Sequence, residues 1–587
     1  MMPENNKIQI LDAYLQVSAL QQQGKKGFLR SWPSQLPVFQ AVAAHKHEQT
    51  MFEGLTGAQV PELIPKGYQN GDPQLFYVTE LEQTLSQLDR QLLSLKDKLT
   101  LAISLTEAVS SLHERDVFHL SLRPSVFLIS QDLSQVQIMD LSSARYCAKS
   151  SIGINAYRPL FSDAHYLSPE QSYPVDRLLD NRTDLYALGC VLTWLFSGQP
   201  PFAHLNGEHE IAYGHISGQP QLPELQHPCV HLAINQLLSL LLEKEADNRY
   251  QSCAGVLQDL HKIHQSCLAG ESLTDLSERS DISDRLHIPQ RLYGREEETA
   301  QLLQAFERVA EGPSEALLIG GYSGVGKSAL VHEIHKPILK SNGLFVFGKF
   351  DQYQRGTPYS ALVQAFNHFI RYLLSLPDQE VSEWRQRLNQ ALQPNGQVLV
   401  DLLPELGRLL GPQPELPQLG PEEQQNRFNR TFLQFVHEIC VSNKPLVIFI
   451  DDLQWADLAS INLLHLLLSD ADSHYCLILG AYRDNEVDER HPFIRMLAEL
   501  DNSSRLRQLV LQPLTQPTVQ QLIADTVQQQ PEQVTNLTQL VYQKTGGNPF
   551  FFRQFMQELY QRELLHFDYQ DASWRWSVTA IDQQCMT

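Results

Sequence analysis

The segment from residue 316 to 330, ALLIGGYSGVGKSAL, constrains the fold of this chain more than any other stretch. Its apolar start predicts a buried strand, which gives way to a glycine-rich loop and then to a helix after Lys327 and Ser328. This order of strand, loop and helix is the context in which the pattern G-x-x-x-x-G-K-[ST] marks a phosphate site. The alternative is a glycine-rich turn beside an exposed lysine.

The residues of this loop predict how a polyphosphate would be held. Loop glycines let backbone N–H groups face inward, and the following helix adds its positive N-terminal end. Lys327 is expected to reach the outer phosphates, and the Ser328 hydroxyl to ligate Mg²⁺. The expected nucleotide contacts are Gly321, Gly324, Val325, Gly326, Lys327, Ser328 and Ala329.

Further apolar runs predict a parallel sheet around this loop. Residues 344–350, 445–450 and 476–482 are continuous apolar stretches of the kind found in strands buried on both faces, and 507–511 is a weaker one. Helical patterns separate them, which is typical of an α/β fold.

Charged residues follow two of these predicted strands. Asp451 and Asp452 come directly after the second, where a carboxylate meets the magnesium of a bound nucleotide. We expect Asp451 to hold Mg²⁺ and Asp452 to orient or deprotonate the attacking water; the alternative is that both cap a turn. Arg483 follows the third strand and is expected either to sense the γ-phosphate or to form a surface ion pair.

The first half has a different pattern. Strands are expected over 8–20, 36–44 and 77–81, followed by a helical leucine pattern from residue 81 and a long helix over 99–114. A short strand is expected over 136–139, just before Asp140.

This half resembles a protein kinase, with a small β lobe before a helical lobe. The motifs that carry the resemblance are His119, Asp140-Leu141-Ser142, Ser168-Pro169-Glu170, Thr183–Gly189 and Arg249. The resemblance implies that Asp184 braces the catalytic loop and that Arg249 pairs with Glu170.

The departures from the kinase pattern concern the catalytic groups. Ser121 stands where the resemblance places the catalytic Asp, Val126 where it places a metal-binding Asn, and Arg123 where it places a Lys. The lysine that a kinase carries on a strand of its small lobe aligns best with Gln40 of this chain. No G-x-G-x-x-G motif precedes Gln40. Glu48 takes the position of the helix residue that would pair with that lysine. Since proton transfer, metal and Lys supply most of the catalysis in phosphoryl transfer, we expect a pseudokinase rather than an active kinase. Asp140 is expected to be either a metal ligand or a turn carboxylate.

The second half resembles the AAA-like ATPases of the signal-transduction (STAND) group, above all those of large bacterial proteins that join a Ser/Thr kinase-like domain, this ATPase and a sensor histidine kinase. The segments that carry this resemblance are LYGRE at 292–296, the loop at 321–328, GKFDQ at 348–352, IDDLQWAD at 450–457, GAYRDNEV at 480–487 and TGGNPFF at 545–551. It implies that ATP or ADP binds with Mg²⁺, that Tyr293, Gly294 and Arg295 lie near adenine, and that Gly547-Asn548-Pro549 begins a helical lid. No sensor or histidine-kinase residues follow, so we expect a fragment or a shortened relative.

These observations predict a multidomain α+β and α/β chain. We expect a kinase-like domain over 1–265, with its small lobe over about 1–80 and its large lobe over about 81–265, and a linker over 266–288. A P-loop ATPase core over 289–490 is followed by a last core strand and a helical lid over 491–587.

Composition narrows the function. The formal net charge of −22 disfavours nucleic-acid binding, which needs a concentrated basic stripe. Eight Cys without a C-x-x-C, and no signal peptide or membrane-length apolar run, favour a cytoplasmic protein without a membrane segment. We therefore expect a signalling ATPase that switches self-association or contacts with a downstream protein. The alternatives are an active Ser/Thr kinase with a regulatory ATPase module, and a DNA-binding ATPase of the initiator type.

Overall fold

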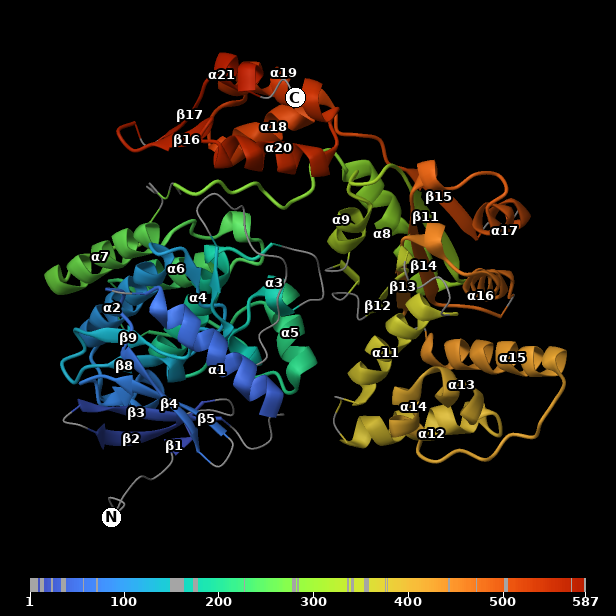
Figure 1. The fold of residues 1–587 in the computed structure, drawn as a ribbon, viewed down its shortest axis with the longest axis horizontal. Coiled ribbons are helices and arrows are strands. Elements are labelled where there is room, and N and C mark those ends of the chain that lie inside the picture. The colour runs from blue at the N-terminus through green and yellow to red at the C-terminus, as the bar shows by residue number, and fades with distance from the viewer. Residues whose placement is uncertain are drawn as a thin grey trace. The chain divides into compact units, whose positions relative to one another are not determined.

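The structure is a computed structural model, and the chain divides into two units that are described separately. One unit comprises residues 1–291 and 559–576, and the other comprises 292–558 and 577–587 (Figure 1). The residues described are 9–10, 15–22, 25–32, 38–55, 57–69, 72–147, 163–172, 178–225, 227, 229–276, 281, 284–334, 337–338, 343–352, 358–374, 376, 378–441, 444–470, 472–500, 505–571 and 573–584. No helix within these ranges is long and apolar enough to cross a membrane.

The first unit begins with an antiparallel sheet of order β1-β2-β3-β5-β4. A single long helix, α1 (Val38–Glu53), lies between β3 and β4 in the chain and packs against β5. The strands are β1 (Gln9–Ile10), β2 (Gln16–Gln22), β3 (Lys25–Ser31), β4 (Glu62–Gln69) and β5 (Asp72–Val78).

The strand predicted over 36–44 is wrong, because the described part of that segment is the first turns of α1. A short apolar run does not distinguish a strand from a buried helix, and the alanines of this run favour a helix. Its buried residues Ala41, Ala44 and Glu48 follow helical spacing.

The helix predicted from the leucine pattern is also wrong before residue 95. Residues 85–87 and 90–92 form short 3₁₀ turns, and α2 begins only after Ser94, whose hydroxyl accepts from the N–H of Asp97.

The large lobe of this unit packs its helices around α4, which is buried along most of its length. Gly189 of α4 allows this packing, because a Cβ there would come within 2.7 Å of Leu241 on α6. The helices are α2 (Leu95–His113), α3 (Pro169–Ser172), α4 (Asn181–Ser197), α5 (Glu208–Ser217), α6 (His231–Leu241) and α7 (Cys253–Ala269). The short strands are β6 (Gln83–Thr84), β7 (Val117–Phe118), β8 (Phe127–Ile129), β9 (Val136–Ile138) and β10 (Arg145–Tyr146), and a hairpin is formed by β16 (Leu565–Asp568) and β17 (Ser573–Trp576).

The composition predicts that the connector after α7 is a solvated surface linker, but some of its described residues are docked on the first unit. Leu276, Leu286 and Ile288 are buried, and Arg285 donates to the carboxylate of Asp116 and to two backbone carbonyls. The sequence signal failed because these few apolar and charged side chains are spaced without a helical or strand period.

The second unit contains a parallel sheet of order β12-β13-β14-β11-β15, as the apolar runs predict. Alternate residues of the strands enter two core layers. Leu317, Val447 and Leu477 pack with α8 and α9 on one face, and Leu318 and Ile448 lie in the layer that includes α11 and α15. The strands are β11 (Glu315–Gly320), β12 (Leu344–Lys349), β13 (Leu446–Asp451), β14 (Cys476–Tyr482) and β15 (Leu506–Val510).

The helices of this unit cover both faces of the sheet (Figure 1). In the chain, α18 to α21 follow β15, the last strand of the sheet. Helices α11 to α15 occupy the long connection between β12 and β13. The helices are α8 (Glu296–Glu311), α9 (Lys327–Glu333), α11 (Ser360–Leu374), α12 (Asp378–Leu392), α13 (Gly396–Leu402), α14 (Pro404–Leu410), α15 (Pro421–Ile439), α16 (Leu458–Ser469), α17 (Pro492–Leu500), α18 (Gln516–Val527), α19 (Thr535–Thr545), α20 (Pro549–Gln561) and α21 (Val578–Gln584).

Candidate functional site

The glycine-rich loop connects β11 to α9 at the carboxyl end of the parallel sheet. Gly324 and Gly326 have φ of +77° and +102°, values that side-chain-bearing residues rarely adopt. A Cβ placed on Gly326 would meet no atom within 4 Å, so this part of the loop faces open space. The Lys327 ammonium donates to the carbonyls of Gly321 and Tyr322, at 2.7 and 2.9 Å. Burial lowers the pKa of Lys327, and the nearby Asp451 opposes that effect.

The structure brings Ser328 and Asp451 together across the sheet. The Ser328 hydroxyl donates to Oδ2 of Asp451 at 3.0 Å, although β14 lies between β11 and β13. Burial and the adjacent Asp452 raise the pKa of Asp451. A hydroxyl and a carboxylate oxygen are hard ligands of the type that Mg²⁺ takes beside a nucleotide phosphate. The residues present therefore fit a magnesium-bound nucleotide.

Asp452 lies beside this pair and is held by side chains from the end of β12, from the residue after β14 and from a short turn. The amide of Gln454 donates to its Oδ1 at 2.7 Å, Lys349 lies 3.3 Å from its Oδ2, and Arg483 Nε lies 3.5 Å from Oδ1. Arg483 also pairs with Glu486 at 2.5 Å. These ion pairs place Arg483 beside the two carboxylates, and sensing of the γ-phosphate stays a prediction.

Tyr293 and Gly294, expected near adenine, lie at the start of the second unit. The Tyr293 hydroxyl donates to Asp525 of α18 at 2.6 Å, and Gly294 has φ +59°, with the Thr518 hydroxyl 3.0 Å from where a Cβ would lie. Neither contact reaches the glycine-rich loop. The next residue does, because Arg295 donates to the carbonyl of Val325 at 3.4 Å. The sequence analysis expected Arg295 near adenine together with these two residues, and its contact with the loop was not predicted.

The turn before α20 also contacts the loop. The Asn548 amide donates to the carbonyl of Ser323 at 2.9 Å, and the N–H of Phe550 donates to the carbonyl of Gly324 at 3.2 Å. Oδ1 of Asn548 accepts from the N–H of Phe550, so the same side chain caps α20. The glycine-rich loop and the start of α20 are therefore joined by two hydrogen bonds, one from Asn548 and one from Phe550.

Lys349 and Gln454 were also missed as members of the site. Both lie in segments that carry the family resemblance, but nothing in their local sequence predicts a contact with Asp452. The register of β12 beside β13, which pairs Lys349 with Asp451, could be learned only from the folded sheet.

The first unit contains a second constellation, at the position of a kinase catalytic cleft. Asp184 accepts from the N–H groups of His119 and Leu120, at 2.8 and 2.7 Å, and Arg249 forms a two-bond pair with Glu170, both at 2.8 Å. These supports of the large lobe are those implied by the kinase resemblance.

Gln40 is not the counterpart of the strand Lys, because it lies in α1. Arg30 of β3 takes that place: its Nη1 lies 2.5 Å from the carboxylate of Glu48 and 2.5 Å from Asp140. Arg123 pairs with the other oxygen of Asp140 at 2.6 Å. Arg30 was missed because its partners, Glu48 and Asp140, lie 18 and 110 residues away in the sequence, and no local pattern reveals such pairs.

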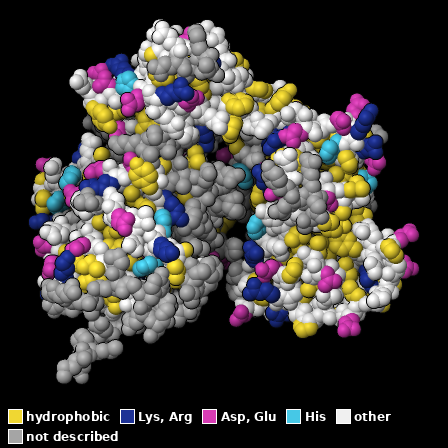
Figure 2. Space-filling view, viewed as in Figure 1, with side chains coloured by type: hydrophobic (Ala, Val, Ile, Leu, Met, Phe, Trp, Pro, Cys, Tyr) yellow, Lys and Arg dark blue, Asp and Glu magenta, His cyan; other side chains and the backbone are white. Residues whose placement is uncertain are grey.

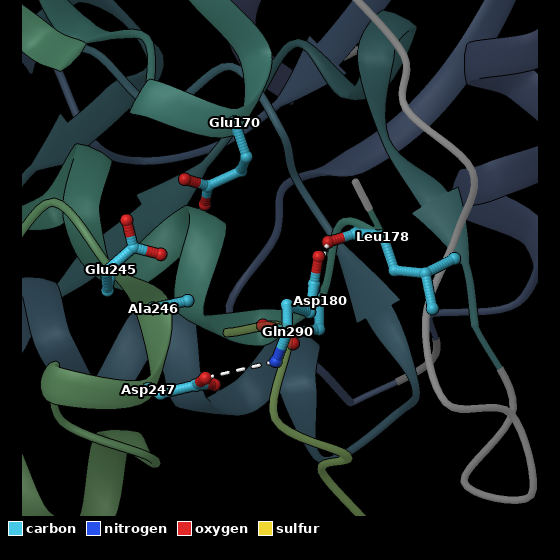
Figure 3. A pocket seen from close by; sticks show the side chains of 7 residues that line it. All are labelled: Glu170, Leu178, Asp180, Glu245, Ala246, Asp247 and Gln290. Atoms are coloured by element: carbon cyan, nitrogen blue, oxygen red, sulfur yellow. Dashed lines mark hydrogen bonds between the residues drawn. The ribbon is translucent and has the colours of Figure 1, made fainter. Parts of the chain in front are cut away.

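A hollow in the large lobe lies beside the Glu170–Arg249 pair. Figure 3 shows Glu170, Asp180, Glu245 and Asp247 around it, together with Gln290, which follows the connector. The N–H of Gln290 donates to Asp247 at 3.1 Å, which extends the docking of the connector to this point.

Comparison with known proteins identifies both domains. Residues 69–261 match the protein kinase domain, and residues 291–479 match the AAA ATPase domain. The chain therefore contains a kinase domain followed by an AAA-type ATPase domain, as the two resemblances predict.

Some relatives are similar to most of this chain, and others are similar to only part of it. Hybrid signal transduction histidine kinase G of Dictyostelium discoideum is 27% identical over 73% of this chain, and the peroxide stress-activated histidine kinase mak3 of Schizosaccharomyces pombe is 21% identical over 80%. The serine/threonine-protein kinase PknB of Mycolicibacterium smegmatis is 32% identical over 30%. The chain spans 15%, 23% and 28% of the length of these three proteins, respectively.

Proposed function

We propose that this chain is a cytoplasmic signalling ATPase that binds Mg-ATP at the glycine-rich loop and hydrolyses it slowly as a conformational switch. The observation that carries the proposal is the contact between Ser328 and Asp451, which joins two expected magnesium ligands at the mouth of the loop. Bound magnesium would neutralise charge on the terminal phosphates. Lys327 would bind the outer phosphates, and Asp452, fixed by Gln454, would orient the attacking water.

The kinase domain is proposed to be a regulatory domain without useful phosphoryl transfer. Ser121 and Val126 replace the groups that would accept a proton and hold a second metal, and both oxygens of Asp140 face guanidinium groups. The relatives named histidine kinases support a signalling role, in which the ATPase changes self-association or contact with a downstream protein. On the face drawn in Figure 2, acidic and basic side chains are interspersed over the described surface of both units, which does not favour a nucleic-acid partner.

ATP binding and turnover by the full chain test the proposal. Lys327→Ala is expected to weaken ATP binding about tenfold or more, because it removes a charged donor to phosphate. Asp451→Asn is expected to lower turnover about a hundredfold or more by weakening the metal. Lys25→Ala, which removes an exposed pair with Glu62 in the first unit, should change neither quantity. Turnover that survives both substitutions in the site would reject the proposal.

The similarity to PknB, named a serine/threonine-protein kinase, favours protein phosphorylation as a second candidate function. Labelled ATP would be supplied to the full Lys327→Ala chain, so that turnover at the glycine-rich loop does not obscure transfer. We expect no transfer to the chain itself or to generic substrates. Transfer that disappears in the additional Asp140→Asn variant would establish the kinase instead.

A further inference from the structure

Lys349 places a cation beside the two carboxylates of the candidate ATPase site. It is the last residue of β12, in register with Asp451 at the end of β13. Its ammonium lies 3.3 Å from Oδ2 of Asp452 and 3.7 Å from Oδ2 of Asp451. Its backbone N–H is fixed by Gln364, so the contact depends on the reach of the side chain alone.

The position of this ammonium conflicts with a metal at the same carboxylate. Oδ2 of Asp451 is the oxygen that accepts from the Ser328 hydroxyl, and these two groups are the expected magnesium ligands. A magnesium ion on that oxygen and an ammonium 3.7 Å from it would repel each other, although water around the half-exposed lysine screens part of this repulsion. The two cations therefore compete for the same oxygen.

The ammonium has its own role without a metal. Asp451 and Asp452 are adjacent, and each is only 6% exposed. Two carboxylates in such a place repel each other unless a cation neutralises them. The positive charge of Arg483 lies beside Asp452, at 3.5 Å, whereas the Lys349 ammonium contacts both Asp451 and Asp452.

We propose that Lys349 is a positioning residue that acts as a placeholder cation: it neutralises Asp451 and Asp452 while the site lacks magnesium, and it withdraws when Mg²⁺ arrives with the nucleotide. Its side chain is 47% exposed and flexible, so it can move into solvent without displacing β12. Competition from Lys349 would then set the Mg²⁺ concentration at which the nucleotide is fully engaged. The inference rests on the proposed nucleotide function and describes the regulation of that site.

The test is a Mg²⁺ titration of the full chain saturated with ADP. Binding is monitored through the thermal midpoint of the second unit, a measurement that requires no turnover. In Lys349→Met the apparent affinity for Mg²⁺ is expected to be about two- to fivefold tighter, since the competitor is a half-exposed ion pair. Its midpoint without metal should be lower than that of the wild type. Lys349→Arg keeps the charge and should behave like the wild type in both respects.

Unchanged or weaker Mg²⁺ binding in Lys349→Met would overturn the proposal. If that variant does not fold, lysine acylation of the wild-type chain decides: Lys349 should react faster with Mg²⁺ and ADP than with ADP alone, and an equal rate rejects the idea. A chain that bound Mg-ADP but never hydrolysed ATP would refute the proposed turnover and leave this titration informative. If ADP did not bind, the same titration with Mn²⁺ alone would decide the role of Lys349.

Discussion

Arg30 and Asp140 form a buried ion pair, 2.5 Å long, between the small and large lobes of the kinase domain. Arg30 is fully buried and also pairs with Glu48, while Arg123 occupies the second oxygen of Asp140. A metal at Asp140 would have to displace a guanidinium group. The pair therefore joins the lobes through the chain's own side chains, at the place where a kinase would use a metal-bound nucleotide.

Replacing Arg30 is expected to destabilise the first unit selectively. Arg30→Met leaves two buried carboxylates without this cation, which costs about 3–5 kcal/mol for a broken buried pair. Calorimetry of the full chain should show a lower transition for the first unit and an unchanged transition for the second. Lys25→Met, on the same strand but in an exposed pair, should cost about 1 kcal/mol or less. Equal shifts for both substitutions would contradict this role of Arg30.

Glu48 makes the stability of the first unit depend on pH. Burial raises the pKa of Glu48 to about 7, although the charge of Arg30 opposes the rise. Because this pKa lies above the unfolded value of 4.5, the stability from this group is complete below about pH 4.5 and is lost as pH rises through about 7. Melting of the first unit at about pH 5 and about pH 8 should show a smaller loss in Glu48→Gln than in the wild type. A loss of the same size in both would show that another group titrates.

The glycine-rich loop could be predicted because its chemistry is local. The strand, the positive-φ glycines, Lys327 and Ser328 lie within about 14 consecutive residues, and the parallel strands carry unbroken apolar runs. Asp451 could be added because the end of a buried parallel strand has a defined place in such a sheet.

What the sequence did not reveal depends on pairing between distant segments. Arg30 was hidden because the segment over 36–44 suits a strand as well as a helix, and once α1 is assigned there the cation must come from an earlier strand. The contact of Lys349 with Asp452 follows from the register of two strands about 100 residues apart. The connector segment around Arg285 has no helical or strand periodicity, so its polar composition alone predicted that it would be exposed to solvent.

Asn548 is expected to couple the glycine-rich loop to α20. It caps the helix through Oδ1 and reaches the Ser323 carbonyl through its amide, so Asn548→Ala loses both contacts and about 0.5–2 kcal/mol of capping. Hydrogen exchange of residues 549–558 should then stop responding to ATP. Asn548→Asp keeps the capping oxygen but has no donor for Ser323, so it should restore the protection of the helix without its response to nucleotide. A normal response in Asn548→Asp would contradict the coupling.

Arg285 is expected to hold the connector on the kinase domain. Its guanidinium donates to the carbonyls of His113 and Cys147 and to the Asp116 carboxylate, close to the segment that precedes the catalytic loop. Arg285→Met removes these donors from a side chain that is 9% exposed and is expected to cost about 1–3 kcal/mol. Hydrogen exchange over residues 284–290 should accelerate, and the first unit should melt earlier. Arg285→Lys retains the charge without the planar fork of donors and should recover only part of the protection. Exchange that is unchanged in Arg285→Met would show that the buried Leu286 and Ile288 hold the connector without it.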